Sequence, residues 1–225
     1  MAQADKIKII ARISSVFSEK FGIPRQSGLA GNISRIIFEE EFRNPDALRG
    51  IEGYSHLWLI WKFSESERET WSPTVRPPRL GGNERMGVFA TRSPFRPNPL
   101  GLSSVELVGV EKTDMGHTLL VKGADLLDGT PIYDIKPYLA FTDSHDDAVG
   151  GFSDAKLSYS LKVDFPKELE ALFCPADAAV IHELLAQDPR PAYIDDAERI
   201  FGLAFGGRQI KFIVFGDTLT VIAVE

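Results

Sequence analysis

The chain has 225 residues, enough for one large domain or for a medium and a small one. Its hydrophobic fraction of 44% and charged fraction of 25% are those of an ordinary globular protein, and its longest apolar runs, HLWLIW and FIVF, are too short to cross a bilayer. The single cysteine, Cys174, excludes an internal disulfide and a cysteine-based zinc cluster. The N-terminus shows no signal-peptide pattern, so we expect a cytoplasmic protein with no membrane span.

The net charge of −7 is unevenly distributed along the chain. Residues 76–96 carry five arginines and one acid, whereas residues 143–198 carry thirteen acids and four bases. A focused positive surface on an acidic protein can attract a polyanion. The same arginines could instead pair with the acidic half of the chain, and charge alone leaves both interpretations open.

No stretch before residue 160 shows sustained helical periodicity, and the pattern up to residue 141 predicts strands. Apolar alternation and aromatic enrichment favour strands at 6–17, 34–39, 55–63 and 86–90, two strands joined by a turn at 114–116, and a short strand after the turn at 128. The segment SHLWLIWKF at 55–63 is apolar on both faces and is expected to be a buried central strand. Because βαβ alternation is absent, this pattern predicts an all-β barrel or sandwich.

The pattern changes near residue 150, where DDAVGG is typical of a hinge. A further strand then precedes two expected helices, which Asp164 and Asp177 would cap and Pro189 would end. A hairpin closes the chain. We therefore expect a mainly β protein with two domains, a β-barrel at 1–156 and a small α+β domain at 157–225.

The sequence offers no standard nucleophile, metal or phosphate-loop chemistry. None of the four histidines is paired with another histidine or a cysteine at ligand spacing, so we expect no metal site. There is no G-x-S-x-G elbow and no P-loop, and GGNERMG lacks the strand–GxGxxG–helix order of a dinucleotide site.

Three proline-stiffened basic loops stand out instead: TRSPFRPNPLGLSS at 91–104, TVRPPRLGGNERMG at 74–87 and PRQSGL at 24–29. Prolines fix φ and reduce the entropy lost when a loop is ordered. Arginines supply planar, charged forks for carboxylates, phosphates or base edges. Such pre-ordered loops suit ligand binding better than simple chain reversal. For any one arginine, an ordinary salt bridge within its loop is an equally good interpretation.

Five segments occur in the order and near the spacing of one known family: PRQSGL, LRGIEGYSHLWLIW, TVRPPRLGGNERMGVFATRSPFRPNPLGLSSVEL, DLLDGTPIYDIKPYL and AQDPRPAY. On these residues the chain resembles the TsaA-like family of bacterial and archaeal proteins. The resemblance implies an S-adenosylmethionine-dependent methyltransferase that acts on N6 of threonylcarbamoyladenosine in the tRNA anticodon loop. It also implies a TsaA-like β-barrel in place of the usual Rossmann-like sheet, and a homodimer.

The resemblance further implies a cofactor site built from several parts of the chain. Carried over motif by motif, its residues are Pro24, Arg25, Gln26, Ser27, Ser64, Glu65, Arg92, Leu102, Gly123, Ala124 and Asp125. The chain departs from the family pattern at two places. Ser27 stands where a proline is common, and Ser64-Glu65 replaces a more usual His-Gln type of pair.

The chemistry that the resemblance implies is an in-line displacement, which needs the attacking nitrogen to be held on the axis of the carbon–sulfur bond. Adenine N6 is a poor nucleophile, and loss of its proton would help. Asp128, Tyr133 and Asp134 in DGTPIYDIKPY are therefore candidate bases or orienters. A turn cap or strand-edge packing explains each of them equally well.

Four residues are candidates for contacting the tRNA: Arg85, Arg96, Arg190 and Tyr193. Arg92 and Arg96 could bind the threonyl carboxylate or an anticodon phosphate, and Arg190 with Tyr193 could clamp the anticodon loop. Two other functions stay open at this point. One is a non-catalytic module that binds a nucleotide or an RNA end, and the other is an S-adenosylmethionine sensor whose acidic C-terminal domain contacts a protein.

Overall fold

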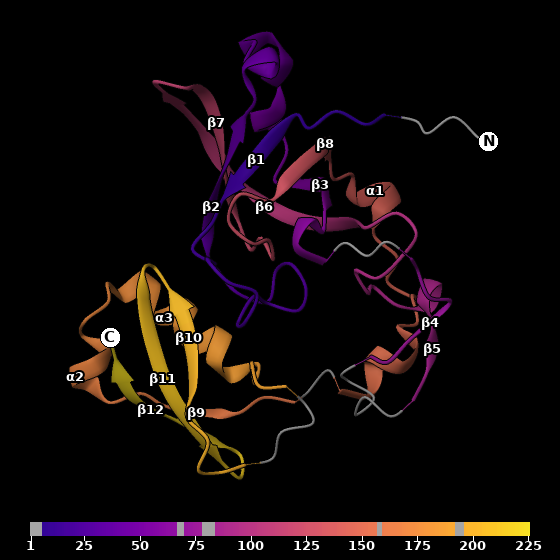
Figure 1. Ribbon diagram of the computed structural model, residues 1–225. Helices are drawn as coiled ribbons and strands as arrows, with labels where there is room; N and C mark the ends of the chain where they lie inside the picture. Colours follow the sequence, from indigo (N-terminus) through magenta and orange to yellow (C-terminus); the bar gives the residue numbers. More distant parts are fainter. Residues whose placement is uncertain (1–5, 67–69, 78–83, 157–158, 192–195) are drawn as a thin grey trace.

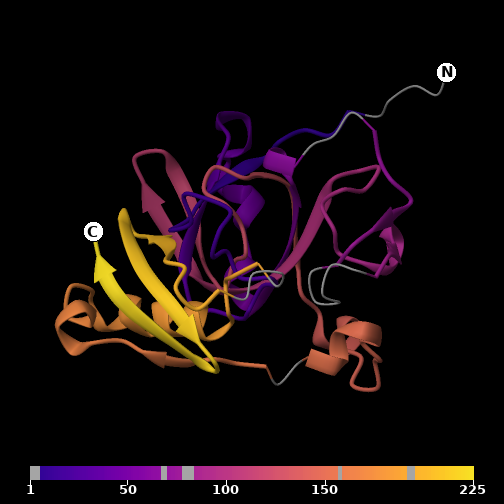
Figure 2. The same cartoon turned by 60° about the horizontal axis from the view of Figure 1, so that its bottom comes forward.

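The computed structural model describes residues 6–66, 70–77, 84–156, 159–191 and 196–225. It has a ring of strands from the N-terminal part and a twisted sheet with a helix from the C-terminal part (Figure 1). In both views the C-terminal sheet lies to one side of the ring, and an arm of two short strands, β4 (Thr74–Val75) and β5 (Met86–Gly87), lies to the other (Figures 1 and 2). The predicted mainly β character is confirmed.

Six strands form a closed barrel in the order β1, β2, β7, β6, β3, β8. Every pairing around the ring is antiparallel. The strands are β1 (Ala11–Ser14), β2 (Ile33–Phe38), β3 (His56–Lys62), β6 (Leu100–Thr113), β7 (Gly116–Lys122) and β8 (Pro131–Pro137). Closure leaves none of these six strands as an open sheet edge, which would otherwise be a template for pairing with another chain.

Alternation along each strand separates the barrel core from its surface. In β3, Leu57 and Leu59 are fully buried and Trp61 is 6% exposed, whereas Trp58 and Ile60 on the outer face are half buried. Side chains from all six strands meet in one apolar cluster. The prediction that 55–63 is buried on both faces therefore holds only for the inner face.

Antiparallel pairing brings three long connections to the same end of the barrel. The β1–β2 loop (15–32), the β3–β6 connection (63–99) and the β7–β8 loop (123–130) all leave that end, which we call the loop end. The opposite end carries three 3-10 helices between β2 and β3, η1 (Glu40–Phe42), η2 (Pro45–Leu48) and η3 (Ile51–Gly53). Among the described residues, the other short helices before the C-terminal sheet are η4 (Ser64–Ser66), η6 (Val88–Ala90), α1 (Ala140–Asp143) and η7 (Gly151–Lys156).

Residues 86–90 do not form a barrel strand, so that prediction was wrong. Only Met86–Gly87 is extended, and it pairs with β4; the next three residues form η6, in which Val88 is 1% exposed. A short apolar run such as GVFA fits a helical turn as well as a strand. The barrel closes through other strands, so this segment has no partner in it. The stiff 91–104 segment therefore leads from η6 into β6 and does not join two core strands.

The C-terminal part is a four-stranded sheet in the order β10, β11, β12, β9. Strand β9 is parallel to β12, and the other pairs are antiparallel. Its elements are β9 (Lys162–Asp164), α2 (Lys167–Glu170), α3 (Pro175–Ala186), β10 (Phe201–Phe205), β11 (Arg208–Phe215) and β12 (Thr218–Val224). Buried side chains of α3 and of the sheet share one apolar cluster.

Several local features of this part differ from the sequence prediction. Helix α3 begins at Pro175 with Cys174 as its N-cap, so Asp177 lies in the first turn and is not the cap. Asp164 ends β9 and does not cap α2, whose N-cap is Pro166. Strand β10 was not predicted, because a five-residue apolar run is ambiguous between a strand and a buried helix.

The β1–β2 loop packs against the C-terminal part and joins the two halves. Phe17 and Ala30 from this loop are at most 4% exposed and belong to the C-terminal apolar cluster. The backbone N–H of Gly31 donates to Glu183 in α3 at 2.7 Å, and Gln187 donates to the carbonyl of Leu29 at 2.9 Å. The loop that contains PRQSGL is therefore held between the barrel and α3.

Candidate functional site

The β1–β2 loop contacts the other two connections at the loop end. The Arg92 guanidinium donates to the side-chain oxygen of Gln26, which ties the 91–104 segment to PRQSGL. The backbone N–H of Gly28 donates to the carbonyl of Gly123 at 2.8 Å. Lys20 donates to the carbonyl of Glu65 just after β3. Three segments that are far apart in the sequence, all expected to hold the cofactor, thus meet around one loop.

Two glycines permit the closest of these approaches. Gly28 and Gly123 have φ of 77° and 83°, a region that side chains disfavour. A Cβ on Gly123 would lie 3.2 Å from the Cα and the N of Gly28. Asn32, 2% exposed, fixes the same segment, because its carbonyl accepts from Gly123 N–H at 3.0 Å and its side-chain N–H donates to the carbonyl of Ala124 at 3.0 Å.

Asp125 is the carboxylate at the centre of this cluster. Its Oδ1 accepts from the hydroxyl of Ser103 at 2.5 Å. Burial raises the pKa of Asp125 above its ordinary value, while the hydrogen bond from Ser103, the charge of Arg92 and the backbone N–H of Ser27 oppose that rise. A partly desolvated carboxylate beside an arginine is typical of a ligand-binding site.

The other predicted cofactor residues also lie at the loop end. Ser64 and Glu65 form the start of η4, directly after β3. Leu102 lies near the start of β6 with 57% of its surface exposed, and it pairs with Ile60 on the outer face. Pro24 is buried within the β1–β2 loop.

The three candidate bases have different surroundings. Asp128 accepts from the backbone N–H of Ser15 at 2.8 Å, so it caps a turn. Tyr133 lies at a bulge in β8, where the register with β3 shifts. Asp134 pairs with Ile60, so it shares an outer row with Leu102, two strands away, and forms an ion pair with Lys136 at 2.8 Å. Bulges commonly re-aim side chains near functional sites.

The candidate tRNA residues are not gathered in one place. Arg85 donates to the hydroxyl of Thr74 at 3.4 Å in the β4–β5 arm. Arg96 donates to the carbonyl of Thr91 at 3.1 Å within its own loop. Arg190 lies in the C-terminal part, and Tyr193 falls outside the residues that the structure describes.

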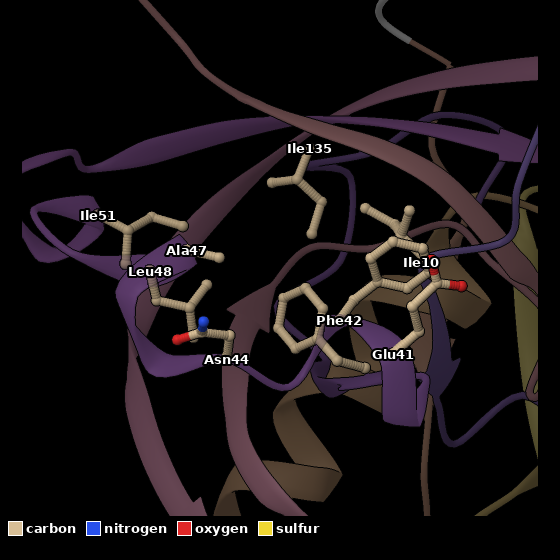
Figure 3. A pocket seen from close by; sticks show the side chains of 9 residues that line it. Ile10, Glu41, Phe42, Asn44, Ala47, Leu48, Ile51 and Ile135 are labelled. Carbon is tan, nitrogen blue, oxygen red and sulfur yellow. The ribbon is translucent and has the colours of Figure 1, made fainter.

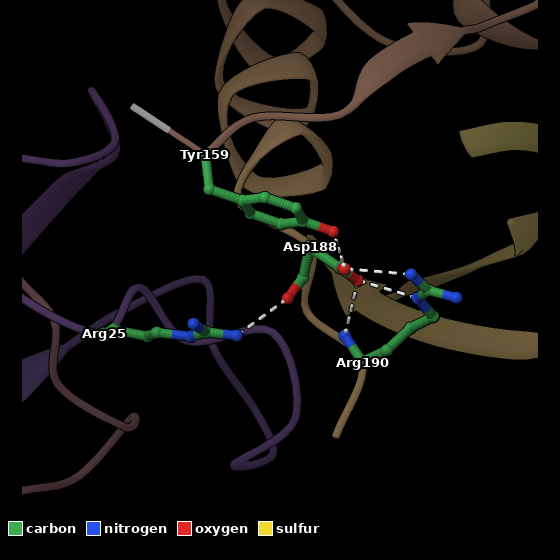
Figure 4. A network of polar contacts seen from close by, with 4 residues as sticks. All are labelled: Arg25, Tyr159, Asp188 and Arg190. Carbon is green, nitrogen blue, oxygen red and sulfur yellow. Dashed lines mark hydrogen bonds and ion pairs between the residues drawn. The ribbon is translucent and has the colours of Figure 1, made fainter. Parts of the chain in front are cut away.

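A polar network joins the β1–β2 loop to the C-terminal part (Figure 4). Arg190 donates two hydrogen bonds to the carboxylate of Asp188, at 2.8 and 2.9 Å, and the Tyr159 hydroxyl donates to the same carboxylate at 2.8 Å. Arg25 donates to the carbonyl of Asp188 at 3.0 Å. Asp188 has a φ of 52°, which turns the chain sharply after α3. Sequence reasoning missed Asp188 and Tyr159, although Asp188 lies within the quoted AQDPRPAY segment.

The apolar pocket in Figure 3 lies away from this cluster, at the opposite end of the barrel. Its volume is about 380 Å³, and its lining residues are Ile10, Phe38, Glu41, Phe42, Asn44, Ala47, Leu48, Ile51 and Ile135. Within the described ranges, no group of three or more His, Cys, Asp or Glu side chains could hold a metal ion. No helix in those ranges is long and apolar enough to span a membrane.

The chain matches two family profiles that together cover most of its length. One is described as the tRNA-methyltransferase O N-terminal domain and matches residues 12–144, and the other, the TrmO C-terminal domain, matches residues 158–225. The chain belongs to the tRNA-methyltransferase O (TrmO) family.

Relatives and a solved structure of the TrmO family agree with this assignment. A relative from Escherichia coli, named tRNA (adenine(37)-N6)-methyltransferase, is 45% identical over 191 residues, covering 82% of this chain and 81% of that protein. A relative from Pseudomonas aeruginosa, whose name describes an S-adenosylmethionine-dependent methyltransferase, is 42% identical over 195 residues with the same coverage. A crystal structure of TrmO from Pseudomonas aeruginosa superposes with a TM-score of 0.79 at 32% identity, covering 100% of this chain and 98% of that chain.

Proposed function

We propose that this protein transfers a methyl group from S-adenosylmethionine to N6 of an adenine in the tRNA anticodon loop, the adenine being one that carries a threonylcarbamoyl group. Membership of the TrmO family and the names of its relatives support the methyl donor and the tRNA acceptor. The observation that carries the proposal is the meeting of three connections at the loop end around Gln26, Arg92 and Asp125. A tRNA substrate also favours a cytoplasmic location.

The side chains at the loop end fit this methyl donor. S-adenosylmethionine supplies a methyl group on a cationic sulfonium, and its methionyl part carries an ammonium and a carboxylate. Asp125 offers a negative charge for the cationic groups, and Arg92 offers a fork for the carboxylate. The Gly28–Gly123 contact brings backbone close to the site without side chains in the way. We propose as cofactor residues Pro24, Arg25, Gln26, Ser27, Ser64, Glu65, Arg92, Leu102, Gly123, Ala124 and Asp125.

Residues of the outer row would orient the acceptor adenine. In the transfer, the N6–carbon bond forms as the carbon–sulfur bond breaks, and N6 gives up its proton to a base or to water. Among the three candidates, Asp134 is the best placed by register, because it shares the outer row with Leu102. Tyr133, at the bulge beside Asp134, would help to orient the acceptor adenine. Asp128 would support the turn in which it lies by accepting from the backbone N–H of Ser15.

Basic residues near the loop end would contact the tRNA. We propose Arg85 on the β4–β5 arm and Arg96 as phosphate or carboxylate contacts. The Arg190 side chain is only 11% exposed and is engaged by Asp188, so we propose that it supports the network of Figure 4. We also propose Tyr193 as an RNA contact on the family resemblance alone.

The chain is proposed to act as two domains and as a homodimer. The barrel domain, 1–156, would bind the methyl donor, and the domain at 157–225 would contact the tRNA. The arginine-rich 76–96 segment of one protomer suits the acidic 143–198 segment of its partner.

Methyl transfer to tRNA tests the proposed function directly. The purified protein is incubated with methyl-labelled S-adenosylmethionine and with tRNA that carries or lacks the threonylcarbamoyl group, and digested nucleosides are separated by mass. We expect a labelled N6-methyl product only from the modified tRNA. Cofactor binding without any transfer to either tRNA would contradict the proposal and favour a non-catalytic nucleotide-binding module or sensor.

Arg92 and Arg96 are expected to fail in different ways when replaced by alanine. Arg92→Ala should weaken S-adenosylmethionine binding about tenfold, because a hydrogen bond to a charged group is worth about 1.5–3 kcal/mol. Arg96→Ala should keep cofactor affinity within about twofold and reduce transfer to tRNA, with the salt dependence of tRNA binding shallower by about one ion. Calorimetry and a salt series on both variants measure this. Equal losses of melting temperature with unchanged affinities would show that both arginines only hold their loop.

A further inference from the structure

A chain of hydrogen bonds runs from the barrel core to the carboxylate of Asp125. The indole N–H of Trp61 donates to the hydroxyl oxygen of Ser103 at 3.0 Å, and Ser103 bonds Oδ1 of Asp125 at 2.5 Å. Trp61 is 6% exposed and Ser103 is 1% exposed, so both lie inside the barrel. Neither residue belongs to the cofactor site that the family resemblance implies.

The chemistry of the three groups fixes the direction of this chain. An indole N–H only donates, so the Ser103 oxygen must accept from Trp61. A hydroxyl has one proton, and with its oxygen oriented by Trp61 that proton is directed to the carboxylate of Asp125. Hydrogen bonds of this kind favour the ionised form of the acceptor.

Gly101 makes the geometry possible. It pairs with Trp61 across β3 and β6, and a Cβ at this position would lie 2.2 Å from Cε2 of the indole. Gly101 and Ser103 are two residues apart, so they lie on the same inner face of β6. Because Gly101 has no side chain, the indole extends over it to reach Ser103. The Phe63 ring packs against the indole, with the two ring centroids 4.3 Å apart. This accounts for Gly101 and Ser103 in PLGLSS, at the end of the 91–104 segment.

The charge of Asp125 depends on the few groups that face it. Burial raises its pKa, and the groups that counter this are the Ser103 hydroxyl, the Arg92 guanidinium and the backbone N–H groups of Ser27 and of Asp125 itself. Of these, Ser103 is the largest opposing contribution. A partly desolvated carboxylate keeps its charge only if such donors are held in place.

We propose that Trp61 and Ser103 are positioning residues of the cofactor site, which act through Asp125 by holding its carboxylate ionised and aimed at the cationic part of S-adenosylmethionine. This inference rests on the proposed function, because it takes S-adenosylmethionine as the ligand of Asp125. Trp61 and Ser103 do not touch the ligand themselves. Through their hydrogen bonds they fix the orientation of the Asp125 carboxylate relative to the strands of the barrel.

Four variants test the chain: Ser103→Ala, Trp61→Phe, their double variant, and Trp58→Phe as a matched control. Trp58 lies on the same strand, but its N–H donates to Asp143 at 2.8 Å on the outer side of the barrel. We expect Ser103→Ala to weaken S-adenosylmethionine binding about tenfold and Trp61→Phe about threefold. In the double variant Trp61→Phe should add no further loss, because its effect passes through Ser103. Trp58→Phe should bind like the parent.

A titration without the cofactor separates positioning from packing. In the parent, the indole N–H resonance of Trp61 should shift with pH as Asp125 titrates, and this shift should disappear in Ser103→Ala. A second measurement follows S-adenosylmethionine binding as the pH is lowered. The affinity of Ser103→Ala should start to decrease at a higher pH than the affinity of the parent does, because loss of the hydroxyl donor raises the pKa of Asp125.

The outcomes distinguish this inference from the proposed function. If the parent binds S-adenosylmethionine and the variants lose only melting temperature, with affinity and pH profile unchanged, Trp61 and Ser103 merely pack the core and the inference is overturned. If the parent binds no S-adenosylmethionine, the proposed function fails, and the role of Asp125 in binding fails with it. Independent, additive effects of the two single variants would also overturn the inference.

Discussion

The Asp125→Asn variant is expected to bind S-adenosylmethionine about 10- to 100-fold more weakly than the parent, and to melt at the same temperature or slightly above it. The asparagine amide has the shape of the carboxylate and keeps an oxygen that can accept from Ser103, but it carries no negative charge. A hydrogen bond between the ligand and a charged group is worth about 1.5–3 kcal/mol. Burial raises the pKa of Asp125, so the ionised carboxylate costs the ligand-free protein some stability that the amide recovers. Calorimetric titration and a thermal melt measure the two effects.

The pH dependence of this variant follows from the direction of the shift. Because the pKa of Asp125 is raised, the parent should lose affinity as pH falls through that raised value, and Asp125→Asn should lack this loss. The folded parent also binds the proton more tightly than the unfolded chain. Its stability relative to Asp125→Asn should therefore rise as pH falls through the same range.

Asp217→Asn is the control for a general effect of charge. Asp217 is exposed on the turn between β11 and β12 and pairs with Lys162, far in sequence from the loop end. The affinity of the Asp217→Asn variant for S-adenosylmethionine should stay within about twofold of that of the parent. A large fall in melting temperature for Asp125→Asn with unchanged affinity would mean that Asp125 supports the fold and not the ligand.

Arg190→Ala is expected to lower the free energy of unfolding by about 3 kcal/mol, since it leaves the nearly buried carboxylate of Asp188 without its charged partner. For a chain of this length that corresponds to a fall in melting temperature of roughly 6–12 °C. Adding Asp188→Asn to Arg190→Ala should recover part of the loss, because no unpaired charge then remains. Thermal and urea unfolding of the single and double variants measure these differences.

The effect of Arg190→Ala should fade at acid pH. Burial alone would raise the pKa of Asp188, but the hydrogen bonds from Arg190 and Tyr159 outweigh it and lower the pKa below its ordinary value. A group with a lowered folded-state pKa stabilises the fold above its unfolded value and loses that contribution as pH falls through the folded value. Parent and variant should therefore converge in acid.

The exposed ion pair between Lys162 and Asp217 provides the control for this network. Its side chains are 77% and 69% exposed, so Lys162→Ala should leave the free energy of unfolding nearly unchanged, because water screens an exposed ion pair. A similar small change for Arg190→Ala would show that the Asp188 cluster is no more than a surface contact. A large loss of affinity for S-adenosylmethionine beside the loss of stability would indicate that the link through Arg25 also supports the proposed cofactor residues of the β1–β2 loop.

Part of the fold was accessible from local pattern. The aromatic and apolar run at 55–63 and the two segments flanking the turn at 114–116 predicted strands, and the absence of helical periodicity before residue 160 predicted a mainly β structure. The pattern failed at 86–90, where an apolar run of strand-like composition turns into η6. It also failed at β10. Short apolar runs do not reveal whether a pairing partner exists, and the partner decides whether a strand forms.

The sequence by itself determined the family, the stiff basic loops and the residue types available to the site. Only the tertiary structure decided which of them meet, because closure of the barrel sets the register that brings Gly28 to Gly123 and Ser103 to Asp125. The link from Arg25 to Asp188 spans 163 residues and depends on the packing of the β1–β2 loop against α3. Local propensity carries no information about contacts at such separations. These contacts form because closure of the barrel and burial of the two apolar clusters fix the positions of the segments that carry the contacting residues.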